Sequence, residues 1–289
     1  MNTESIQKKD CGIMEKIKNK SPLRYPGGKT RACKVLNKMI QENFDTSKFQ
    51  TLVSPFLGGG SFEFHLQHEY GWTIVANDKF APLYNFWNIC KTRKRELCEE
   101  LYKRVDKIEK SDFTTLRSKI MEEKDPMEKA VMYFIINRCS FSGSTLSGGF
   151  SLEASKKRFT KSSVDRIGQL NLANFNIEGL DFVDFLGKNA HCETTLLFLD
   201  PPYYLEKNSK LYGKKGDMHE NFDHDKLFQC LSKRKNWFMT YNNCEYIRNL
   251  YKDYKIFEVN WSYGMCNVQS KSKEEKAKMK KSSEIVIVG

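Results

Sequence analysis

The sequence predicts a doubly wound α/β fold, a sheet with helices on both faces. Apolar runs of strand length end at Val53, Val75 and Leu199. A glycine-rich turn follows the first run and leads into a helix-like segment. Asp78 stands at the end of the second run about 20 residues beyond that turn, a spacing typical of doubly wound folds.

The length of the chain indicates one core with a substantial insertion, and its composition indicates an anionic binding partner. The 289 residues exceed the usual size of a single domain. The net charge of +12, with 13 tyrosines and 20 phenylalanines, suits a partner whose phosphates pair with Lys and Arg and whose bases stack on rings. Nucleic acid is the simplest such partner, although a high pI also arises from solubility or codon usage.

The cysteines and the apolar runs bear on the compartment. Nine cysteines without a Cys-x-x-Cys pair indicate reduced thiols rather than disulfides or a zinc site. His65 and His68 lie three apart, but no second pair completes a tetrahedral set, so we expect no metal. No apolar stretch has the length of a signal peptide or a membrane span, so we expect a cytoplasmic protein that does not contact a membrane.

The amino-terminal region has two parts. Residues 1–20 are polar and lysine-rich, which predicts a flexible basic arm that either touches phosphates or is an inert tail. Residues 24–30 contain Gly-Lys-Thr, but Leu23 stands where a phosphate-binding loop needs its first glycine, so triphosphate binding is not expected. Residues 31–42 then predict a helix with one apolar face.

The glycine turn is a candidate nucleoside site. Gly58 and Gly60 allow positive φ and a close approach of the backbone to a ligand, and Ser61 is expected to cap the next helix. A glycine cluster alone is weak evidence, because many tight turns share it. Asp78 lies where an acid meets ribose hydroxyls, although acids at strand ends are often only solvated.

Charge-rich helices interrupt the strands between residues 88 and 174. Helical patterns over residues 91–120 and 127–137 lack strand-like alternation, which places an inserted target-recognition subdomain here. Residues 140–151 are rich in glycine and serine, and a basic cluster follows them. This combination favours DNA contact over a plain surface loop, and the cluster contains Lys156, Lys157, Arg158 and Lys161.

The remaining segments complete the expected sheet. Residues 176–181 predict a strand after which Asp181 and Phe182 could lie beside an adenine ring. Further strands are expected at residues 194–199 and 237–241, and the latter is followed by a helix near residues 246–251. Residues 256–261 and 284–288 are expected to close the sheet as a hairpin, with residues 269–281 as a mobile loop near the substrate.

Asp200-Pro201-Pro202-Tyr203 is the most informative motif. An aromatic amine is a poor nucleophile because its lone pair is delocalised, and acceptors that bind its hydrogens draw the nitrogen toward sp3 geometry. The Asp200 carboxylate and a prolyl carbonyl supply such acceptors, and Tyr203 offers a face for a base that has swung out of a duplex. The plainer interpretation is a turn that ends a strand.

With these motifs in this order, the chain resembles the Dam-type DNA adenine-N6 methyltransferases from about residue 21 to residue 289. The resemblance implies a Rossmann-like sheet that uses S-adenosylmethionine, formed by residues 21–87 and 175–289, with an inserted, mainly helical recognition subdomain at 88–174. It departs after the Asn137-Arg138 pair, where the family has Asn-Gly. The implied donor-binding residues are Tyr25, Lys29, Phe56, Gly58, Gly60, Asp78, Asp181, Phe182 and Asp200, and the implied DNA contacts include Arg138 and Ser142.

We therefore expect direct methyl transfer to adenine N6 in double-stranded DNA, with Asp200, Pro201, Pro202 and Tyr203 as the catalytic residues. Cytosine-N4 transfer, RNA adenine or protein glutamine methylation, and an inactive DNA-binding module remain alternatives. A nicotinamide oxidoreductase would leave the Asp200 motif unexplained. Cytosine-C5 transfer is disfavoured because the chain lacks a Pro-Cys pair. The resemblance also suggests a monomer and, as a partner, a restriction endonuclease that acts on the same site.

Overall fold

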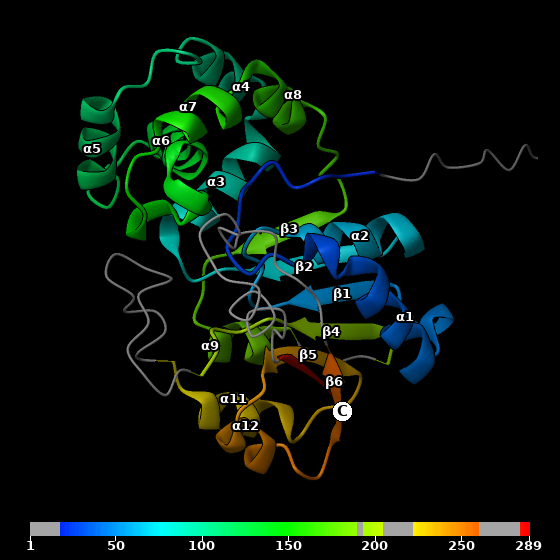
Figure 1. Cartoon of the computed structure of the whole chain (residues 1–289). Helices are drawn as coiled ribbons and strands as arrows, with labels where there is room; N and C mark the ends of the chain where they lie inside the picture. The colour runs from blue at the N-terminus through cyan, green and yellow to red at the C-terminus, as the bar shows by residue number, and fades with distance from the viewer. Residues whose placement is uncertain (1–17, 190–192, 205–221, 260–283) are drawn as a thin grey trace, which may run out of the picture.

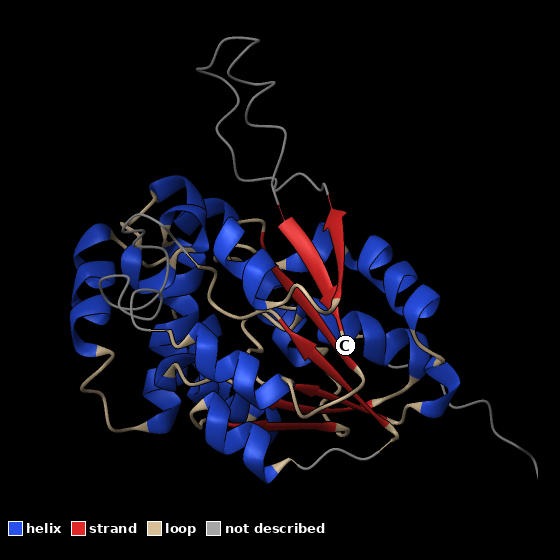
Figure 2. Ribbon diagram, turned by 90° about the horizontal axis from the view of Figure 1, so that it is seen from below, coloured by secondary structure: helices blue, strands red, loops and turns tan. Residues whose placement is uncertain are grey.

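The computed structural model describes residues 18–189, 193–204, 222–259 and 284–289. Most of the expected basic arm and the whole loop expected at residues 269–281 lie outside the described residues. The described chain forms a twisted sheet flanked by helices, with a separate group of helices above it (Figures 1 and 2).

Seven strands form one sheet in the order β3-β2-β1-β4-β5-β7-β6. The first five in this order are parallel, and β7 runs antiparallel to both of its neighbours, which confirms the closing hairpin. The order reverses between β1 and β4, the switch point at which doubly wound sheets bind ligands. The strands are β1 (Thr51–Ser54), β2 (Thr73–Asn77), β3 (Phe175–Glu178), β4 (Thr195–Leu199), β5 (Trp237–Asn242), β6 (Lys255–Val259) and β7 (Glu284–Val288).

Helices cover both faces of the sheet because its central strands are apolar on both sides. All five residues of β4 are buried. One face packs against α1 (Cys33–Asn43) and α2 (Ser61–Tyr70), and the other against α9 (Phe182–Lys188), α11 (His224–Leu231) and α12 (Glu245–Leu250). The doubly wound fold predicted from the sequence is therefore confirmed.

The chain between β2 and β3 forms only helices and turns, which we call the helical module (residues 81–168). Its centre is α6 (Pro126–Cys139), of whose fourteen residues eleven are buried, so the other helices surround it (Figure 1). These are α3 (Ala81–Thr92), α4 (Lys94–Tyr102), α5 (Lys110–Lys119), α7 (Leu152–Arg158) and α8 (Lys161–Gly168), with the 3-10 turns η3 (Phe141–Gly143) and η4 (Thr145–Ser147).

Three local expectations need correction. The helix expected from residue 31 begins with a 3-10 turn, η1 (Lys29–Arg31), before α1. Ser61 does not cap α2, because Gly60 takes the cap position in a left-handed conformation at φ 66°. Asp181 does not end a strand, since β3 stops at Glu178 and the Asp181 carboxylate instead caps α9 by accepting from the Val183 amide.

Candidate active site

Residues from three distant parts of the sequence meet at the carboxyl edge of the sheet. Asp200 directly follows β4, and Thr240 lies near the end of the neighbouring strand β5. The segment before α1 brings Lys29 to the same edge. Parallel strands end at one edge, so this convergence follows from the sheet topology.

The Asp200 carboxylate is held from several directions. Lys29 Nζ lies 2.8 Å from Oδ1 and 2.9 Å from Oδ2. The Thr240 hydroxyl donates to Oδ1 at 2.7 Å, and the Tyr203 hydroxyl lies 3.2 Å from the same oxygen. The Lys29 side chain is 4% exposed and the Asp200 side chain is 24% exposed. The carboxylate is therefore held by buried groups and remains partly accessible to a ligand.

Lys29 also fixes its own neighbourhood. Its ammonium group donates to the Gly27 carbonyl and to the Tyr203 hydroxyl, each at 3.0 Å. Three polar partners therefore compensate for the burial of this charge. The Tyr203 ring is half-buried and lies 5.7 Å from the Tyr241 ring at an angle of 26°. A second stacked pair, Tyr204 and Tyr246 at 4.4 Å, extends this aromatic surface beside the carboxylate.

The glycine turn is shaped by the ring of Tyr25. Gly58 has φ 52°, and a Cβ atom there would lie 2.8 Å from the Tyr25 ring. A Cβ atom on Gly59 would lie 2.9 Å from Tyr25 Cβ. Both the backbone conformation and the close approach therefore favour glycine. Tyr25 and the turn, which were predicted to share one site, are in direct contact.

Asp78 connects the end of β2 to the glycine turn. Its Oδ2 accepts from the Gly58 amide and its Oδ1 from the Phe80 amide, each at 3.0 Å. The side chain is 8% exposed, and burial raises its pKa to about 6 against the two hydrogen bonds. Each carboxylate oxygen has more than one lone pair, so Asp78 can still accept from a ligand hydroxyl.

Phe56 and Phe182, which were both predicted to line the donor pocket, lie next to each other. Their ring centroids are 5.7 Å apart, and Phe222 lies within 5.5 Å of Phe56 and 5.1 Å of Phe182. This group offers apolar faces on which a purine can stack. The neighbouring Asp181 side chain is 35% exposed, and its carboxylate forms an ion pair with Lys79 at 2.8 Å.

Two polar residues of this edge were not predicted. Thr240 binds Asp200 directly, as described above. Asn77 is 1% exposed and bridges the two loops at the edge, donating to the Pro55 and Leu180 carbonyls at 3.2 and 3.0 Å and accepting from the Leu180 amide at 2.8 Å. Asn77 and Thr240 are each a polar residue within an apolar strand, β2 and β5, and this pattern is the signal that could have identified them.

Glu63 is a third unpredicted residue, and it lies on α2 beneath the site. It is 2% exposed and accepts a 2.8 Å hydrogen bond from the Ser54 hydroxyl. Burial raises its pKa to about 7, and the charge of Asp200 adds to the rise while the hydrogen bonds and Lys29 oppose it. The sequence gives no signal for this burial, because a glutamate in the first turn of a helix is commonly exposed.

The basic residues predicted to contact DNA separate into two groups. Lys156, Lys157, Arg158 and Lys161 are exposed at the ends of α7 and α8. Arg138, in contrast, is 7% exposed and donates to the Arg158 carbonyl at 2.7 Å and the Pro22 carbonyl at 3.2 Å. Arg138 is therefore buried in a structural role, which corrects its prediction as a DNA contact.

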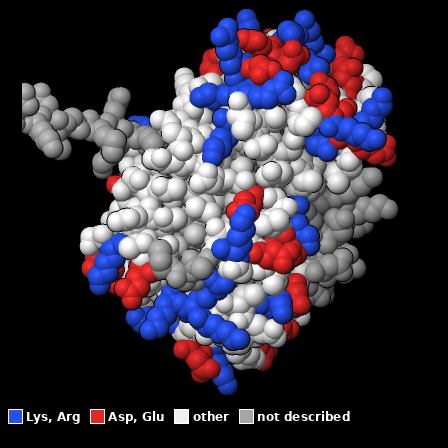
Figure 3. Space-filling view, turned by 180° about the vertical axis from the view of Figure 1, so that it is seen from behind, with Lys and Arg blue, Asp and Glu red and all other residues white. Residues whose placement is uncertain are grey.

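Ser142, in the loop after α6, is partly exposed in a left-handed conformation at φ 54°. Its neighbour Phe141 is 58% exposed, which is unusual for so large an apolar side chain. The charge run at residues 91–95 differs from this region, because Arg93 and Arg95 pair with Glu96 and Glu99 on the same helix. Figure 3 shows such mixed charges over the helical module at the back of the molecule.

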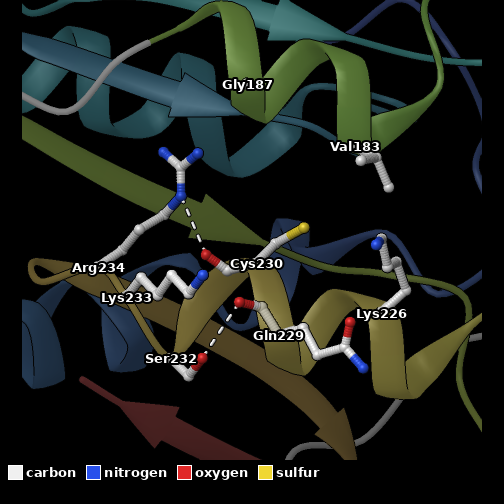
Figure 4. Close-up of a pocket in the computed structure, with 8 residues that line it drawn as sticks. All are labelled: Val183, Gly187, Lys226, Gln229, Cys230, Ser232, Lys233 and Arg234. Atoms are coloured by element: carbon white, nitrogen blue, oxygen red, sulfur yellow. Dashed lines mark hydrogen bonds between the residues drawn. The ribbon is translucent and has the colours of Figure 1, made fainter.

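A cavity between α9 and α11 lies apart from these residues. Figure 4 shows Val183 and Gly187 on one side of it and residues of α11 and the following turn on the other, including Lys226 and Arg234. No residue predicted for the donor site or for catalysis lines this cavity. We therefore place the active site at Asp200 and not here.

The described residues contain neither a cluster of metal ligands nor a membrane-spanning helix. Within the described ranges, no three His, Cys, Asp or Glu side chains are grouped so that they could hold a metal ion. Among the described helices, none is long and apolar enough to cross a membrane.

The switch-point carboxylate, the glycine turn and the acid that follows β2 are features of an α/β enzyme with its site at the carboxyl edge of the sheet. The chain belongs to the D12 class N6 adenine-specific DNA methyltransferase family, which it matches over residues 25–265. It is therefore an enzyme that methylates adenine N6 in DNA, and the family implies S-adenosylmethionine as the methyl donor. This confirms the resemblance in the sequence motifs. A search of curated proteins found no match.

Proposed function

We propose that the carboxyl edge of the sheet binds S-adenosylmethionine beside a flipped adenine, with Asp200 between them. The chemistry of the residues fits the donor. Phe56 and Phe182 offer aromatic faces for its purine, and the Asp78 carboxylate offers acceptors for ribose hydroxyls. Gly58 and the ring of Tyr25 bring the backbone and an aromatic surface to the same place.

When bound, the donor would supply a sulfonium methyl group. Asp200 and the Pro201 carbonyl would accept hydrogen bonds from the adenine amine and orient its lone pair. Lys29 and Thr240 would keep the carboxylate in this orientation. A carboxylate has about four lone-pair sites, so Asp200 can accept from the amine without losing Lys29. The chain contributes mainly position and local electrostatics.

The helical module, with the loop that follows α6, is the proposed DNA-binding part, corresponding to the subdomain expected at residues 88–174. Support comes from the exposed basic residues at the ends of α7 and α8, and from the partly exposed Ser142 and the exposed Phe141 in the loop after α6. An exposed ring can stack on bases that a flipped adenine leaves behind. Flipping would cost a few kcal/mol, and stacking on Tyr203 would recover part of it.

The finer points of partnership are also proposals. One chain supplies both the candidate donor site and the candidate DNA surface, which supports action as a monomer. A cytoplasmic location is proposed from the cysteine pattern, which indicates reduced thiols. A restriction endonuclease with the same target sequence is proposed from the family resemblance. Sequencing DNA from expressing cells with a method that reports modified bases would give the target sequence.

The observation that carries the proposal is the contact of Lys29, Thr240 and Tyr203 with one partly exposed carboxylate at the switch point. The test uses the whole chain, tritiated S-adenosylmethionine and duplex DNA. We expect label in DNA, and digestion should recover it as N6-methyladenine. Recovery of N4-methylcytosine, or an unlabelled duplex despite donor binding, would overturn the assignment.

A further inference from the structure

Asn137 joins the helical module to the segment that carries Tyr25 and Lys29. It lies near the end of α6 and is fully buried at 0% exposure. Its side-chain oxygen accepts from the Arg24 amide at 2.9 Å, and its side-chain nitrogen donates to the Arg24 carbonyl at 2.6 Å. One amide group therefore binds both backbone groups of Arg24, as a neighbouring strand would.

The loop after α6 packs on the same residue. The Arg24 guanidinium donates to the Ser140 carbonyl at 3.0 Å. A Cβ atom added to Gly143, which has φ 74°, would lie 2.6 Å from Arg24 Cβ and 2.7 Å from the Arg24 carbonyl oxygen. The loop and the backbone of Arg24 thus form one closely packed unit. The exposed Phe141 belongs to this loop.

The other end of the segment reaches the catalytic carboxylate. Tyr25, directly after Arg24, packs on Gly58 and Gly59. The Gly28 amide donates to the Tyr25 carbonyl at 3.1 Å, which closes a turn that ends at Lys29. Lys29 then binds Asp200. A continuous series of hydrogen bonds and packing contacts therefore connects the Asn137 amide to the Lys29 ammonium group.

We propose that Asn137 is a positioning residue for methyl transfer, which links the DNA-facing loop after α6 to Lys29 and Asp200. The inference rests on the proposed function, because it assumes that Asp200 orients the adenine. Asn137 touches neither substrate nor donor in this account. It acts through the Arg24 backbone. When the loop after α6 binds DNA, it would keep that backbone in the position that lets Lys29 hold Asp200.

Asparagine is suited to this position because it both accepts and donates. Aspartate has nearly the same shape and keeps the acceptor for the Arg24 amide, but in its ionised form it has no hydrogen to donate to the Arg24 carbonyl. A matched control is available in Asn19, which is also buried, at 8% exposure. It holds the same segment from upstream through Gln67 and both backbone groups of Asn171. Asn19 does not contact the loop after α6 in any described hydrogen bond.

The test compares Asn137→Asp, Asn19→Asp and the wild type by single-turnover methyl transfer at saturating donor and DNA. We expect Asn137→Asp to lose on the order of 100-fold in rate, the scale of loss that a misplaced catalytic group causes. Its Kd for DNA should stay within about threefold, because the contact surface is intact. Asn19→Asp should lower the Tm and keep most of the rate. A rate for Asn137→Asp close to wild type, or an equal loss in Asn19→Asp, would overturn the inference.

A second pair of variants decides the question if Asn137→Asp does not fold. Gly143→Ala presses a methyl group against Arg24, while the control Gly187→Ala, on α9, meets nothing within 4 Å. We expect about a tenfold lower saturated rate only for Gly143→Ala. Equal rates for the two would reject the link. If the wild type itself labels no adenine, the proposed function fails instead, so the two failures are distinguishable.

Discussion

The edge of the sheet and the helical module use charge in opposite ways. At the edge, Lys29 is 4% exposed and is bound to Asp200, Tyr203 and a backbone carbonyl. In the module, Lys156 and Arg158 are exposed and form no ion pair with any other described residue. The first arrangement fixes a geometry, and the second leaves charge available for a phosphate backbone. In the proposed function, the sheet edge therefore positions the reacting groups and the helical module supplies the affinity for DNA.

The largest effect should follow from Asp200→Ala, because it removes the fixed carboxylate. We expect the methyl-transfer rate to fall by about a thousandfold or more while Kd for DNA changes little. Single-turnover kinetics and a DNA-binding titration would measure this, with Asp253→Ala on the surface as the control. If the variant kept its turnover, Asp200 would not take part in the mechanism. The buried charge at the sheet edge would then not serve to position the reacting groups.

Tyr203→Ala should have the next largest effect. Loss of a stacking face worth about 1–3 kcal/mol should slow transfer about tenfold more on duplex than on single-stranded DNA, where no base pair must open. Tyr203→Phe is the matched control, since it keeps the ring and removes only the hydroxyl that contacts Lys29 and Asp200. Equal losses on both substrates would argue against base flipping.

The basic cluster should change affinity and its salt dependence. Replacing Lys156, Arg158 and Lys161 by glutamine should weaken DNA binding and lower the slope of log K against log salt by up to about 0.9 for each lost phosphate contact. Binding titrations at several salt concentrations would measure the slope. The saturated transfer rate should change little.

Arg138→Gln sharpens this prediction by contrast, because its guanidinium binds two backbone carbonyls inside the protein. We expect a lower Tm and an unchanged salt slope. A changed slope would return Arg138 to the DNA-contacting residues, whereas an unchanged slope in the triple variant would remove the basic cluster.

The smallest effect concerns pH and Glu63. Its pKa is raised by burial from 4.5 to about 7, so the folded state binds this proton more tightly than the unfolded chain does. Stability from this group is therefore full below about pH 4.5 and is lost as the pH rises to about 7. Glu63→Gln should remove that loss, about 1–3 kcal/mol between pH 5 and pH 8 in urea titrations. A parallel pH profile in the variant would contradict the assignment, and Asp78 should leave a weaker dependence up to about pH 6.

Much of the sheet edge could be predicted from the sequence because its motifs follow apolar runs. The strands before Asp78 and Asp200 are short and apolar, and parallel strands bring their carboxyl ends together. The contacts of Thr240 and Asn77 could not be predicted in the same way. Their partners lie 40 and 103 residues away along the chain, so only the strand register brings them together.

The helical module was less predictable for a physical reason. A basic residue near a helix end looks the same in sequence whether it faces solvent, as Lys161 does, or turns inward, as Arg138 does. The helical pattern predicted α6 and, as a single stretch, the region of α4 and α5, but not α7 or α8. The packing around α6 decided which charges remain outside.

The sequence by itself determined the order of strands, turns and carboxylates, because local propensity and apolar periodicity act over a few residues. The tertiary structure decided which of those groups touch. The bond from Asn137 to Arg24 spans 113 residues, and the pair of Lys29 and Asp200 spans 171. Such contacts depend on the packing of whole elements, which local sequence does not encode.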